Sequence, residues 1–133
     1  MAHNHRRLGQ NLAAEKVLYG LISQKRQASV NPALVYDDYD TLFKHFLTYD
    51  LEKAIKLAKA LLQYENSSMP NSHIKLFNFN LGNAFLMAGN YSDAKVRLRN
   101  CLESDPQGAL KVFAFNNLGL CCWWHKNPLE SRE

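Results

Sequence analysis

The most constraining feature of this 133-residue sequence is a Leu-Gly step that occurs twice in the middle of a helix-like apolar stretch. Leu81-Gly82 and Leu118-Gly119 are both flanked by apolar residues at helical spacing. A glycine inside a helix costs roughly 1 kcal/mol relative to alanine. We therefore expect both glycines to lie where a neighbouring helix comes too close to leave room for a Cβ atom.

Apolar residues recur at helical spacing along nearly the whole chain, and short polar or breaker segments separate these stretches. The expected helices cover residues 8–28, 33–48, 51–65, 73–88, 92–104 and 109–125. Asp50 is placed to cap the third helix, and Gly89-Asn90 to end the fourth. Only residues 77–80 alternate as a strand does, and they are too few. The sequence therefore predicts an all-α fold.

Residues 75–108 combine two expected helices and a turn with a distinctive set of residues. The set is Leu81, Gly82, Phe85, Gly89, Tyr91, Ala94, Leu98 and Pro106. It resembles the tetratricopeptide (TPR) repeat, a helix–turn–helix unit of about 34 residues. Cys101 replaces the second Ala of the family pattern, and Asn78 replaces its usual Trp.

Two further segments resemble the same repeat less closely. Residues 35–68 keep the small and apolar positions of the second helix but have Thr41-Leu42 in place of Leu-Gly. A third copy begins near Val112, has Leu118-Gly119 in register and stops at Asn127-Pro128. The resemblance implies a TPR-like array of about two and a half repeats in residues 35–133, preceded by a helix and linker in residues 1–34.

The resemblance also implies a concave groove, lined by the first helix of each pair, that holds a peptide or a partner helix. The expected partner-binding residues are those that the resemblance places in this groove, together with Trp124, which follows the last of them. They are Tyr39, Phe43, Phe46, Phe79, Asn83, Leu86, Asn116, Leu120, Trp123 and Trp124. Family members that clamp a C-terminal carboxylate use basic residues where Phe79, Phe113 and Asn117 stand here, so an apolar segment or helix is the expected ligand. The alternative is that several of these side chains fill the core under the N-terminal helix.

The last expected helix ends in two adjacent Trp residues, Trp123 and Trp124, which follow Cys121 and Cys122. We expect these side chains to form a partly uncovered apolar edge, and such edges contact other molecules. Three interpretations remain open. The chain docks into a larger assembly by this edge, it dimerises through it, or it is a piece of a longer repeat array.

The basic character of the chain is confined to its first quarter. Residues 1–34 hold Arg6, Arg7, Lys16, Lys25 and Arg26 against one acid, Glu15, whereas residues 35–133 hold equal numbers of acidic and basic side chains. The expected first helix gathers Leu8, Leu12, Val17, Leu18, Leu21 and Ile22 on one broad face. Such a segment resembles a mitochondrial presequence. The alternatives are a helix packed on the first repeat or one lying on a membrane surface.

No residue pattern points to catalysis, a cofactor or a metal. Cys121, Cys122 and His125 do not have a common zinc-ligand spacing. An odd number of cysteines favours a reducing, intracellular compartment. The resemblance of residues 1–34 to a presequence makes the mitochondrion slightly preferred to the cytoplasm. The expected function is a non-enzymatic protein-interaction scaffold or accessory subunit. RNA binding by a helical repeat is the alternative, and the lack of net charge in residues 35–133 speaks against nucleic acid as the partner.

Overall fold

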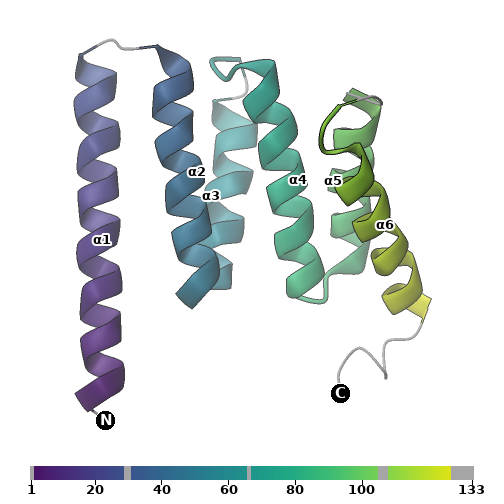
Figure 1. Ribbon diagram of the computed structural model, residues 1–133, viewed down its shortest axis with the longest axis horizontal. Coiled ribbons are helices and arrows are strands. Elements are labelled where there is room, and N and C mark those ends of the chain that lie inside the picture. The colour runs from purple at the N-terminus through teal and green to yellow at the C-terminus, as the bar shows by residue number, and fades with distance from the viewer. Residues whose placement is uncertain (1, 29–30, 66, 105–107, 127–133) are drawn as a thin grey trace.

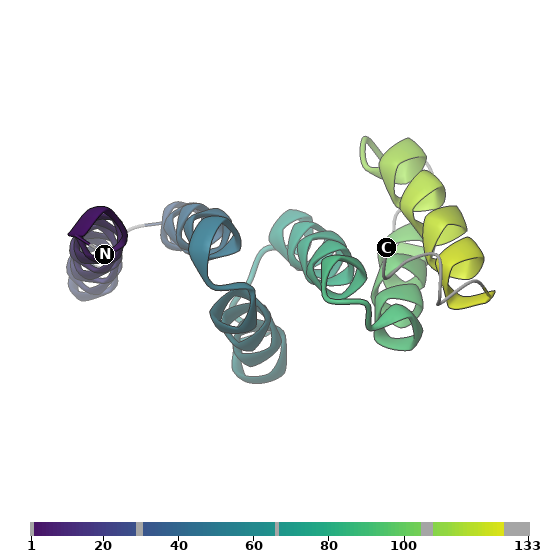
Figure 2. The same ribbon diagram turned by 90° about the horizontal axis from the view of Figure 1, so that it is seen from below.

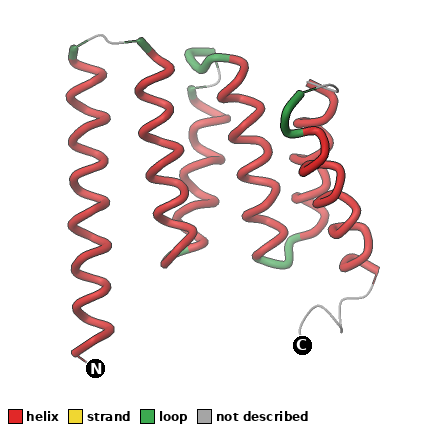
Figure 3. Tube along the Cα trace, viewed as in Figure 1, coloured by secondary structure: helices red, strands yellow, loops and turns green. Residues whose placement is uncertain are grey.

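The computed structural model describes residues 2–28, 31–65, 67–104 and 108–126. Within these residues the chain forms helices and no strand (Figures 1 and 3). The helices are α1 (Ala2–Gln27), α2 (Pro32–Tyr49), α3 (Leu51–Tyr64), α4 (Asn71–Met87), α5 (Tyr91–Ser104) and α6 (Lys111–Lys126). The predicted all-α fold is confirmed, and each predicted helix is present. Only α1 differs much in extent, because it begins several residues earlier than predicted.

The helix boundaries follow from local capping chemistry. Asp50 accepts a hydrogen bond from the backbone N–H of Lys53 at 3.2 Å, as the sequence predicted. Gly89 ends α4 with a φ of 79°, a left-handed conformation that glycine adopts without strain. This turn lets the N–H of Asn90 donate to the carbonyl of Phe85 at 2.9 Å, and the N–H of Gly89 donate to Leu86 at 3.1 Å.

Each helix packs against the next one in the chain, so the molecule is an extended row of helices rather than a closed bundle (Figure 1). In addition, α2 contacts α4, and α4 contacts α6. The helices α2, α4 and α6 therefore form one layer, and α3 and α5 lie in a second layer beside it (Figure 2). At opposite ends of the row stand α1, next to α2, and α6, next to α5.

The hydrophobic core runs along the contact between the two layers. Its largest fully buried side chains are Phe43, Phe46, Phe77, Leu42, Leu61, Leu81, Leu98 and Cys121. Both helix pairs, α2 with α3 and α4 with α5, contribute to it. Burying large apolar side chains is the main stabilising term in such a fold, at about 1.5–3 kcal/mol for each one.

The helix α1 contributes little to this core, although its apolar residues share one broad face. Leu8, Leu12, Val17 and Leu21 are exposed, and among the predicted face residues only Ile22 is buried. Polar contacts hold α1 in place instead. They join Glu15 to Tyr49 and Lys53, Lys25 to Asp38, Arg26 to Glu65 and Tyr39, and the carbonyl of Asn11 to His45.

Candidate functional site

The Leu-Gly steps of α4 and α6, Leu81-Gly82 and Leu118-Gly119, have opposite surroundings. A Cβ atom on Gly82 would lie 2.8 Å from Cγ and 3.0 Å from Cδ2 of Leu98, a fully buried residue of α5. The predicted close approach is therefore confirmed at Gly82. At Gly119 the prediction is wrong, because among the described residues no atom that such a Cβ would meet lies within 4 Å. The side of α6 that carries Gly119 is open.

The helices α4 and α6 nevertheless bury corresponding residues on the side that faces the core. Phe77, Leu81 and Ala84 are buried on α4, and Ala114 and Cys121 are buried at the corresponding places on α6. Leu118, which matches Leu81, packs against the core. This common register lets corresponding positions of the two helices be compared one by one.

The sequence-predicted partner-binding residues of α4 and α6 lie on the same side of their helices. They are Phe79, Asn83 and Leu86 on α4 with Asn116, Leu120 and Trp123 on α6, and we call this set the α4–α6 face. Leu120 is 48% exposed and Trp123 is 49% exposed, whereas Phe79 and Leu86 rest partly on the core. The face therefore offers apolar and aromatic side chains with no charged residue among them.

An amide pair joins the two halves of this face. Nδ2 of Asn117 donates to Oδ1 of Asn83 at 2.7 Å. The bond fixes the orientation of the Asn83 side chain between Phe79 and Leu86. A neutral amide in an apolar strip is a group that can hydrogen-bond a peptide backbone without selecting for charge.

The predicted residues on α2 do not belong to an open surface. Phe43 and Phe46 are 1% and 2% exposed and lie in the core. Tyr39 is partly buried, stacks on Tyr36 at 5.9 Å and accepts a hydrogen bond from Arg26 at 3.0 Å. The physical reason is that α1, α3 and α4 all pack on α2. On α2, therefore, Phe43 and Phe46 fill the core, as the alternative interpretation expected.

The C-terminal Trp pair is half open. The rings of Trp123 and Trp124 meet edge to face, with centroids 4.6 Å apart. Trp124 is partly buried, and Cys121 is fully buried. Burial raises the pKa of the Cys121 thiol, which disfavours the reactive thiolate. Only Trp123, of these three side chains, is exposed to a partner.

A line of polar contacts between α2, α4 and α6 was not predicted. Nε2 of His73 lies 2.7 Å from Oδ1 of Asp37, and Nδ2 of Asn80 donates to Oδ1 of Asp40 at 2.7 Å. Asp37 and His73 are 36 positions apart, so helical spacing gives no sign that they meet. The hydroxyl of Ser72 lies 3.4 Å from Nδ1 of His73, which completes a Ser-His-Asp sequence of contacts.

This Ser-His-Asp arrangement has the composition of a hydrolase triad but not its geometry. A nucleophile and its base lie about 2.6–3.2 Å apart in such sites, and Ser72 is farther than that from His73. His73 is buried at the contact between α2 and α4. We assign the pair His73–Asp37 a structural role, which is to hold these two helices together.

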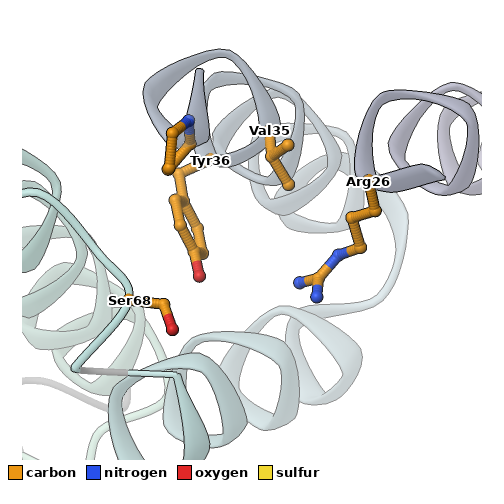
Figure 4. A pocket seen from close by; sticks show the side chains of 5 residues that line it. Arg26, Val35, Tyr36 and Ser68 are labelled. Atoms are coloured by element: carbon orange, nitrogen blue, oxygen red, sulfur yellow. The ribbon is translucent and has the colours of Figure 1, made fainter. Parts of the chain in front are cut away.

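A hollow of about 270 Å³ lies where the ends of α1 and α2 meet the segment before α4 (Figure 4). Arg26, Pro32, Val35, Tyr36 and Ser68 line it. Arg26 is ion-paired with Glu65, and Tyr36 donates to the same carboxylate at 3.1 Å. Burial and the Glu65 carboxylate raise the pKa of Tyr36 to about 12. Because these groups satisfy one another, the hollow presents no unpaired charge to a ligand.

Comparison of the chain with protein families, with curated proteins and with solved structures found no match. In the part of the chain that the structure describes, no group of three or more His, Cys, Asp or Glu residues could hold a metal ion. None of the described helices is long and apolar enough to cross a membrane.

Proposed function

We propose that this chain is a non-enzymatic, TPR-like scaffold that binds an apolar peptide or helix of a partner protein, or sits by the same surface in a larger complex. The observation that carries the proposal is the α4–α6 face. It joins half-exposed leucine and tryptophan side chains to an ordered asparagine pair on two adjacent helices. The TPR-like pattern of residues 75–108 supports the same proposal.

The chemistry of the face favours an apolar ligand. Leu120 and Trp123 are the exposed anchors, and aromatic anchors dominate the energetics of protein interfaces. Asn83 uses its Oδ1 atom to accept from Asn117, which leaves its Nδ2 group to donate to a carbonyl of the bound segment. Burial of apolar side chains would supply the affinity for the bound segment, and the hydrogen bond from Asn83 would fix the position of that segment along the face.

The contacts of α1 support the second interpretation of the N-terminal segment, a helix packed on the first repeat. Glu15, Lys25 and Arg26 each bind a side chain of α2, namely Tyr49, Asp38 and Tyr39. In this proposal α1 covers α2, so the partner binds at the other end of the row. Placement in the mitochondrion, suggested by the basic composition of residues 1–34, remains a separate proposal that import assays can test.

A peptide selection tests the proposed binding face. Peptides selected from a displayed random library against the whole chain are titrated against Leu120→Ser and against Tyr64→Ser. Tyr64 is a matched control, because it is 76% exposed on α3, away from the face. We expect Leu120→Ser to weaken binding about tenfold or more, since one buried leucine is worth about 1.5–3 kcal/mol. Equal binding by both variants would refute the proposed face.

A further inference from the structure

We infer that a second stripe of α6, made of Val112, Phe115, Gly119 and Cys122, is a docking site for an acidic amphipathic helix of a partner protein. We call this stripe the α6 seat. It is distinct from the α4–α6 face, although part of that face also lies on α6. We infer its occupant by comparing α4, which α5 covers, with α6, which no helix of the described residues covers in the same way.

The complete pair is α4 with α5. The α4 stripe that corresponds to the α6 seat contains Asn78, Gly82 and Phe85, and α5 covers it. Leu98 of α5 fills the space over Gly82, and Nη1 of Arg97 donates to Oδ1 of Asn78 at 3.3 Å. Ala94 and Cys101, one helical turn to either side of Leu98, are buried as well. A small–Leu–small stripe thus fits a helix that carries a central glycine.

The α6 seat has the same central glycine, but no helix of the described residues covers it. Nothing lies within 4 Å of the place where a Cβ of Gly119 would stand. Val112 is 64% exposed, and Phe115 is 63% exposed. Gly119 weakens the helix and gains no packing contact in return, and the exposed Phe115 gains no burial. A helix with a leucine over Gly119, arranged as α5 is over Gly82, would give Gly119 a packing contact and would bury Phe115.

Charge decides between the helices that could occupy the seat. The helix α6 carries Lys111, His125 and Lys126 and no acidic residue, and no ion pair among the described residues involves either lysine. The exposed apolar side of α1 in a second copy would bring Arg7 and Lys16 against these lysines. Like charges oppose that pairing, and they favour a partner helix with an acidic border.

The direction of the partner helix follows from the same comparison. The helix α5 runs antiparallel to α4, so an equivalent helix would begin near Lys126 and end near Lys111. Acidic residues in its first turn would then be stabilised both by Lys126 and by the dipole of their own helix. The expected occupant therefore has acids at its start, followed by a small–Leu–small stripe.

A designed peptide can test this inference directly. The probe is the segment 90–104 of this chain with Lys95→Glu and Arg99→Glu, stapled between positions 96 and 100, which are exposed in α5. Stapling is needed because isolated helices of this length are marginal in water. Fluorescence anisotropy measures its binding to the whole chain. The control peptides are the same probe with Leu98→Ala and the stapled segment with its own basic residues.

The protein variants are Gly119→Leu, which fills the seat, and Gly20→Leu as a matched control. Gly20 is also a mid-helix glycine with nothing within 4 Å of its would-be Cβ. We expect saturable binding that falls about tenfold or more with Leu98→Ala or with Gly119→Leu and is unchanged by Gly20→Leu. We also expect the basic control peptide to bind more weakly than the probe, with a difference that shrinks as salt is added.

Three results would overturn the inference. The first is no binding of the probe, or equal binding by its Leu98→Ala form. The second is tighter binding of the basic control peptide. The third is self-association of the chain, seen by light scattering and abolished by Gly119→Leu, which would make a second copy the occupant. Leu120→Ser, on the α4–α6 face, should leave probe binding intact, so failure here is distinguishable from failure of the proposed function.

Discussion

Replacing Gly82 or Gly119 by alanine should change the stability of the chain in opposite directions. Gly119→Ala adds a methyl group where the structure has open space. It should gain the helix preference of alanine over glycine, about 0.5–1 kcal/mol. Gly82→Ala gains the same preference but places its methyl group 2.8 Å from Cγ of Leu98.

The clash at Gly82 has no easy release. Leu98 is fully buried, and the contact involves the branching carbon of its side chain as well as one terminal methyl group. Overpacking a well-packed core costs about 1–3 kcal/mol. After the gain in helix preference is subtracted, Gly82→Ala should destabilise the chain by up to about 2 kcal/mol. The two variants should therefore differ by about 1–3 kcal/mol.

Urea unfolding followed by circular dichroism measures both variants against the unaltered chain. Gly20→Ala serves as a control and should behave like Gly119→Ala, because its would-be Cβ also meets nothing within 4 Å. If Gly82→Ala proves as stable as Gly119→Ala, then α5 does not hold Leu98 over α4 as described. In that case α5 over Gly82 would not be a valid guide to the helix that is proposed to bind over Gly119.

Three further predictions concern what holds the helices together. The raised pKa of Tyr36, about 12 against an ordinary 10.0, gives stability that is complete below pH 10 and is lost as the pH rises towards 12; Tyr36→Phe should flatten this alkaline loss in urea titrations at a series of pH values. Glu15→Ala removes the contacts at 2.7 Å to Tyr49 and 3.3 Å to Lys53, so hydrogen exchange should show α1 opening more easily, whereas Glu52→Ala, which breaks an exposed pair, should not. Phe77→Ala should destabilise by about 3–5 kcal/mol, and the 60%-exposed Phe113→Ala by much less, in thermal melts. Alkaline stability unaffected by Tyr36→Phe, equal exchange in the two Glu variants, or equal melting of the two Phe variants would contradict the respective contacts.

Features governed by neighbours in sequence were predictable. The helix positions follow from apolar spacing, and the ends at Asp50 and Gly89 follow from capping groups that act within a few residues. The tight packing at Gly82 was predicted correctly from the cost of a mid-helix glycine, but the same reasoning fails at Gly119, so that cost alone does not locate a close contact.

Features governed by the placement of whole helices were not predictable. The apolar residues of α1 form a broader face than α2 covers. The sequence alone does not show which of them meet α2, so the exposure of Leu8, Leu12, Val17 and Leu21 could not be predicted. The burial of Phe43 and Phe46 depends on how the other helices surround α2. The same holds for Gly119, because Leu118-Gly119 matches Leu81-Gly82 in sequence but no helix of the described residues lies over it.

Peptide binding to the α4–α6 face is most directly tested by mapping a selected peptide on the whole chain by nuclear magnetic resonance. Backbone and side-chain amide signals are followed during the titration, including the side-chain amides of Asn83, Asn116 and Asn117. The α4–α6 face predicts that these amides and the backbone signals of Leu120 and Trp123 shift together, with α1 and α3 unaffected. Shifts confined to α1 and α3, with Asn83 and Leu120 unchanged, would show that the partner binds elsewhere.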